Sequence, residues 1–144
     1  MRDQMNELHF KRAISPVSSA DSTALTGEVI DLQGYAACTF VIATGSIGDA
    51  DATFAVEVQE CDTSGGSYTA VADANLIGTE ALAGFIFSDD NKCFKVGYQG
   101  SKRYVKIVIT PTGSSGTPSA ALRAAVAVLG HPNRIKTLTS PWAT

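Results

Sequence analysis

Apolar and polar residues alternate with a period of two through most of the middle of the chain. Between residues 53 and 60, Phe54, Val56 and Val58 fall on one face, and the residues between them fall on the other. This spacing is typical of a half-buried β-strand, because successive side chains of a strand point to opposite faces. The pattern predicts strands over residues 23–32, 36–44, 53–60, 68–72, 93–98, 103–110 and 119–129.

Turn signals separate these runs. The stretch 62–67 reads DTSGGS, and its glycines supply the positive φ that tight turns require. Residues 53–72 are therefore predicted to form a hairpin. Gln33-Gly34 is predicted to turn the chain between the first two strands, and residues 111–118 are predicted to form a loop.

The segment 119–129 fits two patterns. Leu122, Val126 and Leu129 have the spacing of a helical stripe, whereas Leu122, Ala124, Val126 and Val128 fit one face of a strand. Its valine content and the flanking proline and glycine favour a strand, although short apolar runs are ambiguous by periodicity alone.

About eight short strands with little helix indicate an all-β, single-domain antiparallel β-sandwich. We expect the sandwich to cover residues 23–130, preceded by an N-terminal arm over 1–22 with a short helical turn around 2–9, and followed by a C-terminal tail over 131–144. The chain of 144 residues is long enough to bury one core. The predicted core contains Phe40, Phe54, Val56, Val58, Val96, Val105, Ile107 and Val126.

The charges are unevenly distributed along the chain. Residues 1–90 carry 14 acidic and three basic side chains, a net −11, whereas residues 91–144 carry eight basic side chains and no acid, a net +8. Such asymmetry can mark a surface for a charged partner. The alternative is that strands from the two parts interleave, so that the charges mix in space.

The cysteines and the ends of the chain give further expectations. Cys38, Cys61 and Cys93 are odd in number and widely spaced, so we expect free thiols in a protein made in a reducing cytoplasm. The first residues lack the apolar stretch of a signal peptide, and no run approaches the ~18 apolar residues of a membrane span. The sequence predicts no membrane partner.

Motifs for catalysis or cofactor binding are missing. Neither His9 nor His131 belongs to a nucleophile or metal motif. The acidic turns around Asp49 and Asp51 and around Asp89 could supply oxygen ligands for Ca²⁺, but they lack the longer calcium-loop pattern, and aspartate is also common in ordinary turns. We predict no enzyme activity, no cofactor and no metal.

The basic stretch 92–106 carries Phe94, Tyr98 and Tyr104 among its cations. Cations interleaved with aromatic residues would suit a groove for single-stranded nucleic acid. Because Phe94 and Tyr98 share the alternating face that should be buried, a strand pair with one solvated charged face is preferred, and no nucleic-acid partner is predicted.

Four segments resemble the small head proteins of tailed phages, the capsid cement or decoration proteins. They are GEVIDLQGYAACTFVIATG (27–45), VEVQECDTSGGSYTAV (56–71), KVGYQGSKRYVKIVIT (95–110) and VAVLGHP (126–132). The resemblance lies in the overall residue pattern of most of the chain, over about residues 23–132, and not in a catalytic motif. It implies a jelly-roll-like fold, a homodimer or other homo-oligomer, a place on the outer surface of the virion after assembly in the host cytoplasm, and the major capsid protein as partner.

The family has no catalytic residues to carry over, so candidate contacts come from the two ends of the chain. We expect contacts through Phe10, Arg12, His131, Arg134, Lys136 and Trp142. Tryptophan is enriched among residues that carry interface energy, which makes Trp142 the expected anchor. In the alternative arrangement Trp142 caps the end of its own sandwich.

A second function is left open from a different class. A ligand- or carbohydrate-binding β-sandwich module of a phage particle would use exposed aromatic side chains, and Tyr35, Tyr68 and Trp142 are the candidates.

Overall fold

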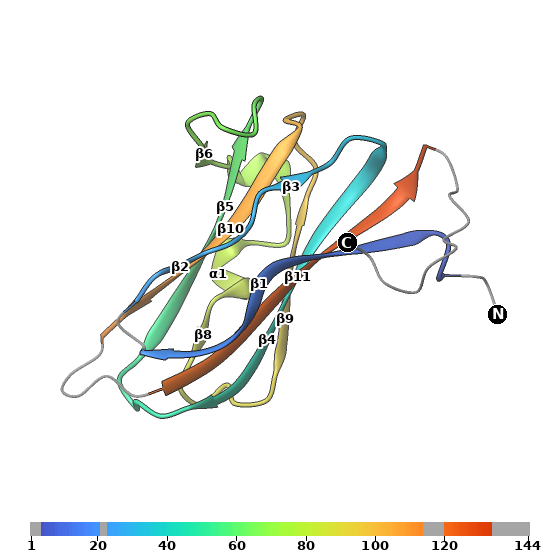
Figure 1. Ribbon diagram of the computed structural model, residues 1–144. Coiled ribbons are helices and arrows are strands. Elements are labelled where there is room, and N and C mark those ends of the chain that lie inside the picture. Colours follow the sequence, from blue (N-terminus) through green and yellow to red (C-terminus); the bar gives the residue numbers. More distant parts are fainter. Residues whose placement is uncertain (1–3, 21–22, 114–119, 134–144) are drawn as a thin grey trace.

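A computed structural model describes residues 4–20, 23–113 and 120–133, and only the backbone of Ser19, Ala20 and Ala120. Two antiparallel sheets lie face to face (Figure 1). Sheet A contains, in spatial order, β1 (Leu8–Ala20), β11 (Ala120–Pro132), β4 (Tyr35–Ile47), β9 (Cys93–Tyr98) and β7 (Leu76–Ile77). Sheet B is built on the long strands β10 (Tyr104–Thr112) and β5 (Thr53–Cys61), with the short strands β2 (Leu25–Thr26), β3 (Ile30–Asp31), β6 (Thr69–Ala70) and β8 (Phe85–Ile86) at its edges.

The order of pairing is that of a jelly roll. Strands from the two ends of the chain pair in a nested series: β1 with β11, β2 and β3 with β10, β4 with β9, and β5 with β6 and β8. The nested pairs alternate between the two sheets, as in a long hairpin rolled into a sandwich. The predicted fold class is therefore confirmed. In the part of the chain that the structure describes, helix is limited to one 3₁₀ turn, η1 (Asp73–Asn75), and one turn of α-helix, α1 (Glu80–Ala83).

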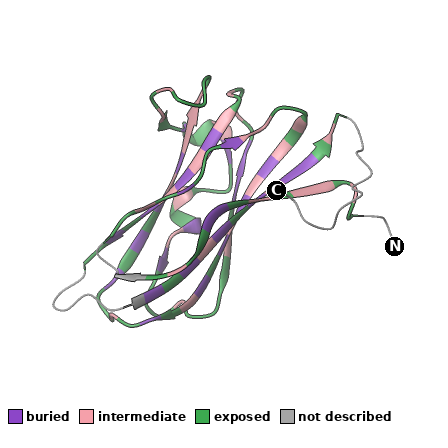
Figure 2. Ribbon diagram, viewed as in Figure 1, coloured by how far each residue is buried: buried purple, intermediate pink, exposed green. Residues whose placement is uncertain are grey.

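The core lies between the sheets, and the buried residues recur along each long strand (Figure 2). Two stacked ring pairs continue across it: Phe54 lies 4.7 Å from Phe85, and Phe85 lies 5.6 Å from Phe94, between ring centres. Seven of the eight predicted core residues are buried: Phe40, Phe54, Val56, Val58, Val96, Val105 and Ile107.

The eighth, Val126, corrects the prediction. Residue 119 lies outside the described residues, and 120–129 do form a strand within β11, but Val126 is 37% exposed, on the face directed away from sheet B. The inward face of β11 carries Leu129 and small alanines together with Arg123, which is 2% exposed. The guanidinium carbon of Arg123 lies 4.8 Å from the ring centre of Phe54, an attractive cation–π distance. The face of β11 that points into the core is thus the opposite of the face that hydrophobicity alone would place there.

The N-terminal arm is the second correction. Residues 8–20 are not an arm but β1, which pairs along its length with β11 at the edge of sheet A. The register shifts between Arg12 and Ile14 and again between Ile14 and Val17. These bulges, together with Pro16, interrupt the period-two alternation from which a strand could have been predicted.

The segment between β2 and β3 closes the sandwich beside β1. The N–H of Gly27 donates to the carbonyl oxygen of Ile107 at 2.8 Å, and the N–H of Glu28 donates to that of Ala13 at 2.7 Å. One short segment therefore bonds to both sheets. A Cβ on Gly27 would lie 2.8 Å from the Ile107 oxygen and 3.0 Å from the Ala13 oxygen, so the close approach requires glycine.

Within the described residues, no helix is long and apolar enough to cross a membrane.

Candidate functional site

The most unusual surface of the molecule is the side of sheet A that faces away from the core. On β11 the outward residues are Leu122, Ala124, Val126 and Val128, all of them apolar. Pairing register places Phe10 of β1 opposite Val128, and Val41 of β4 opposite Val126. Residues directly opposite each other in an antiparallel pair point to the same side, so these side chains form one continuous layer.

We call this layer the outer face of sheet A. By strand alternation and register, its apolar and small members are Leu8, Phe10, Ser18, Ala37, Thr39, Val41, Ala43, Ile77, Cys93, Gly97, Leu122, Ala124, Val126, Val128 and Gly130. The charged members are Arg12 on β1 and Lys95 on β9, which belong to strands on either side of the central pair β11 and β4.

Several large apolar side chains of this face are exposed. The exposed fractions are 51% for Phe10, 61% for Ile77 and 45% for Leu122. Glycines lie next to two of them: a Cβ on Gly45 would lie 2.7 Å from the Cβ of Leu122, and one on Gly97 would lie 3.0 Å from the Cβ of Ile77. Leu122 and Ile77 therefore cover the glycine backbone of neighbouring strands, which keeps the layer shallow.

The outer face of sheet B has a different character. Its two long strands present Glu57, Gln59, Lys106 and Thr110 between less polar residues. The Lys106 ammonium lies 4.5 Å from the ring centre of Tyr68. Alternation of apolar inward and polar outward residues is usual for an antiparallel sheet with one solvated face. Sheet B follows that rule and the outer face of sheet A does not, and a contiguous exposed apolar patch commonly marks an interaction surface.

The charge asymmetry along the sequence is largely mixed in space. Arg103 pairs with Asp31 at 2.8 Å, and Lys102 pairs with Asp62 at 2.6 Å. Each pair joins a cation from the basic part of the chain to an acid from the acidic part. The bidentate contact from Arg103 is the main reason that the pKa of Asp31 lies below its ordinary value. These contacts favour the interleaved arrangement over a segregated charged surface.

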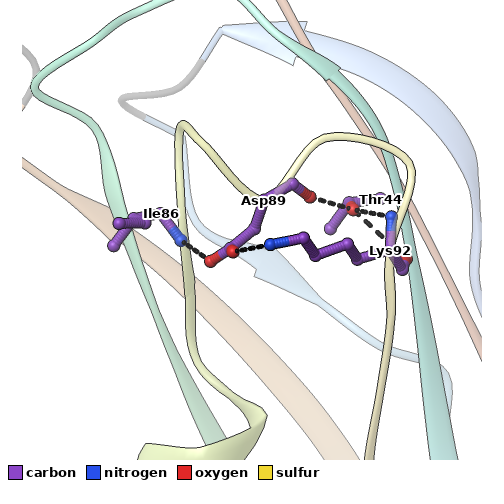
Figure 3. A network of polar contacts seen from close by, with 4 residues as sticks. All are labelled: Thr44, Ile86, Asp89 and Lys92. Carbon is purple, nitrogen blue, oxygen red and sulfur yellow. Dashed lines mark hydrogen bonds and ion pairs between the residues drawn. The ribbon is translucent and has the colours of Figure 1, made fainter.

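The acidic turns serve the fold. Asp89 accepts the backbone N–H of Ile86 at 2.9 Å and the ammonium of Lys92 at 2.7 Å, and its own carbonyl oxygen accepts from the Thr44 hydroxyl at 2.6 Å (Figure 3). Lys92 holds the pKa of Asp89 below its usual range. The Asp49 carboxylate accepts the N–H of Asp51 at 3.0 Å, as in an ordinary aspartate turn. The described residues contain no group of three side chains suited to hold a metal ion.

The three cysteines are free and differ in exposure: Cys38 is buried, Cys61 is half-buried and Cys93 is exposed on the outer face of sheet A. Burial raises the pKa of the Cys38 thiol to about 12. Phe94, Tyr98 and Tyr104 do not line one groove: Tyr98 is buried and hydrogen-bonded to Glu60 at 2.5 Å, and Phe94 packs against the core.

One end of the sandwich carries a depression of about 510 Å³ beside the turn before β4. The rings of His9 and Tyr35 stack there with centres 5.6 Å apart. The depression is also lined by Asp31, Gln33 and Lys11, so an aromatic surface lies next to polar groups. Tyr68 lies elsewhere, under Lys106, so the structure does not unite the predicted carbohydrate-binding aromatics.

The predicted contact residues are only partly brought together. Phe10 and Arg12 join the outer face of sheet A, and Arg12 lies 3.7 Å from the Glu28 carboxylate. His131 is exposed at the end of β11 with a φ of 50°. Arg134, Lys136 and Trp142 lie outside the described residues. The sequence prediction missed Leu122, Val126, Val128 and Val41 as surface residues, because it assigned Val126 to the core and looked for contacts only at the two ends of the chain.

Comparisons with known proteins identify a shared fold. No family model matches the sequence, and no curated protein matches it. Among solved structures, the PBSX exported protein XepA superposes with a TM-score of 0.56 at 10% identity. The match covers 100% of this chain and 44% of that protein, so the chain spans less than half of its length. A xylanase 10B fragment of Clostridium thermocellum with its CBM22-1 and GH10 modules gives a TM-score of 0.43 at 10% identity, covering 94% of this chain and 28% of that one. At these identities, the match to XepA shows that the chain shares a fold with a protein of known structure.

Proposed function

We propose that the chain is a non-catalytic structural protein of a tailed-phage particle, which binds the outer surface of the capsid and cements neighbouring major capsid protein subunits. The observation that carries the proposal is the outer face of sheet A. The core of the sandwich is already complete, yet the outer face of sheet A is also apolar. Such a surface is suited to bind other protein subunits.

Three further observations support this proposal. The ionisable groups of the acidic turns are used in hydrogen bonds and ion pairs that hold loops in place, as for Asp89 and Lys92. The four segments quoted above resemble those of phage cement proteins. The jelly roll is also an architecture common in viral capsid proteins.

Binding to phage heads tests the proposal. The full chain would be mixed with expanded heads that lack it, assembled from the major capsid protein of the phage that encodes it, and the heads would be pelleted. We expect saturable co-sedimentation and a higher temperature of head disruption. A chain that stays in the supernatant at tens of micromolar and leaves the disruption temperature unchanged would contradict the proposal.

The contribution of the C-terminal segment is tested in the same assay. A chain ending at Asn133 keeps all of β11 and the hydrogen bond from the Asn133 N–H to the Gly34 oxygen at 2.8 Å. If Trp142 anchors the chain to the capsid, the shortened chain should keep its melting temperature and lose head binding. A shortened chain that melts several degrees lower and binds heads normally would instead place Trp142 on its own sandwich.

A second candidate function rests on the depression beside Tyr35. Sugars bind to proteins by stacking on aromatic rings and by hydrogen bonding to nearby polar side chains, and the stacked pair of His9 and Tyr35 beside Asp31 and Gln33 offers both. Titration with oligosaccharides, followed by NMR, separates the two functions. The carbohydrate-binding function predicts saturable shifts at Tyr35, whereas the cementing function predicts none at millimolar sugar.

A further inference from the structure

We infer that the outer face of sheet A is the surface through which two copies of the chain pack together, as a twofold dimer with the two faces in contact. The inference rests on the proposed function, because it supplies the unit that would bridge neighbouring capsid subunits. It adds which surface joins the two copies.

The composition of the face suits a partner that carries the same face. Its central strands present only apolar or small side chains, including Leu122, Val126 and Val41, so no charge has to find an opposite charge across the contact. The two cations lie on the flanking strands β1 and β9, where Arg12 is already beside Glu28 at 3.7 Å and Lys95 is exposed. Long cationic side chains can extend from an apolar contact to water. In homodimer interfaces the buried core is more apolar than in transient contacts between different proteins.

The size of the face agrees with a dimer. Strands spaced by about 4.8 Å give the four strands from β1 to β9 a width of about 19 Å. The stretch from Leu122 to Val128, at about 3.3 Å per residue, gives a length of about 23 Å. The projected area is then about 440 Å² on each copy, or roughly 900 Å² for the pair. Because protruding side chains add to the accessible area, the contact reaches the roughly 1,000 Å² that a specific interface needs.

The exposed edge of sheet A is a poorer route to association. An unprotected edge strand invites another chain to extend the sheet. Here β1 carries two register shifts, Pro16, and the adjacent cations Lys11 and Arg12. The carbonyl oxygen of Ala13 on this strand already accepts the backbone N–H of Glu28. Bulges, proline and lysine are the devices that block edge-to-edge pairing. The edge is therefore protected while the face is not.

Other occupants fit less well. Nucleic acid would require several cations for the phosphates, and this face has only Arg12 and Lys95. The major capsid protein and residues 134–144 of the same chain are the remaining candidates. The experiment below distinguishes each of them from a second copy of the chain.

A matched pair of variants provides the test. Val126→Lys places a charge in the centre of the outer face of sheet A, and Val108→Lys places the same charge on the outer face of sheet B, opposite Glu57. Sedimentation equilibrium of the free full-length chain would be measured from 0.5 to 200 µM. We expect the wild type and Val108→Lys to dimerise, and Val126→Lys to dimerise at least about 100-fold more weakly, because a charge buried without a partner is strongly disfavoured. Melting of dilute samples checks that both variants fold.

The exposed Cys93 gives an independent readout on the same face. Its alkylation rate in the wild type should fall as the protein concentration rises through the dimerisation range, while that of the half-buried Cys61, which belongs to sheet B, should not. In Val126→Lys, the Cys93 rate should be independent of concentration.

Three results would overturn the inference. The first is a wild type that remains monomeric at 200 µM. If a chain ending at Asn133 nevertheless dimerises, the face is covered in the wild type by the chain's own C-terminal segment. The second is a Val126→Lys variant that dimerises as tightly as the wild type. The third is a monomeric wild type that binds heads and loses that binding through Val126→Lys, which would assign the face to the capsid and leave the proposed function intact. A dimer that does not bind heads would instead contradict the proposed function alone.

Discussion

The buried face of β11 gives a prediction that distinguishes the structure from an assignment based on hydrophobicity alone. Leu129 is 0% exposed on the inward face of β11, and Val126 is 37% exposed on the outward face of the same strand. We expect Leu129→Ala to be strongly destabilising and Val126→Ala to be nearly neutral in the monomer, although both substitutions shorten an apolar side chain.

The magnitudes follow from burial. Shortening a fully buried leucine to alanine costs about 2–5 kcal/mol, through lost transfer energy and the cavity that remains. Removing the two methyl groups of a partly exposed valine costs about 1 kcal/mol or less, at ~0.8 kcal/mol per fully buried carbon. For a chain of this length each kcal/mol lowers the melting temperature by about 3–4 °C, so we expect a loss of about 6–20 °C for Leu129→Ala and no more than about 4 °C for Val126→Ala.

The assay is urea unfolding monitored by circular dichroism at low micromolar concentration, repeated at several concentrations so that dimerisation does not contribute to the free energy of unfolding. The two variants are controls for each other, since they lie three residues apart on one strand. A larger loss of stability in Val126→Ala than in Leu129→Ala would refute the register, and with it the outer face of sheet A.

Three further predictions concern other parts of the fold. Gly27→Ala should cost about 1–3 kcal/mol in urea unfolding, because its Cβ would press on the Ile107 carbonyl oxygen at 2.8 Å, and a neutral result would contradict the close approach. Desolvation raises the pKa of Glu80 above 4.5, so the folded state binds more protons than the unfolded state above that pH, and this residue lowers stability as pH rises through the folded pKa. Glu80→Gln keeps an acceptor for the Val58 N–H, at 2.6 Å in the wild type, and should gain stability over the wild type between pH 4 and pH 7; an unchanged difference would refute the shift. Cys38 should react with iodoacetamide only on unfolding, as its raised pKa and burial require, and rapid labelling of the native protein would show that it is accessible.

The strands of the core were predictable because each has one wet face and one dry face. The alternation at 93–98 coincides with β9, and the run at 103–110 lies within β10 apart from its first residue. The turn at Gln33-Gly34 is confirmed as well: Gly34 has a φ of 89°, and the Tyr35 N–H bonds to the Leu32 oxygen at 3.0 Å. In these segments local pattern and tertiary burial agree.

The two wrong predictions concern strands that lack a polar, solvent-exposed face or whose alternation is irregular. On β11 the inward positions are Ala121, Ala125, Ala127 and Leu129 with Arg123, while larger apolar residues point outward. A rule that places the largest apolar side chains in the core must reverse such a strand. On β1, bulges and Pro16 interrupt the period, and only pairing with β11 reveals the strand.

The candidate site was accordingly the least predictable part of the molecule. Phe10 and Arg12 were expected to make contacts as part of a flexible arm, whereas they lie on a strand and contribute to a sheet surface. The residues that make this surface continuous come from four other strands, β4, β7, β9 and β11, and their neighbourhood depends on the register of β11 with β4. Sequence periodicity contains no information about that register.

Cryo-electron microscopy of phage heads incubated with the full chain shows directly whether the chain cements the capsid as a dimer. If it does, added density on the outer capsid surface should fit paired jelly rolls, with their five-stranded sheets facing each other and each copy in contact with a different capsid subunit. Heads indistinguishable from undecorated ones, at a chain concentration well above that needed for dimerisation, would contradict the proposed function.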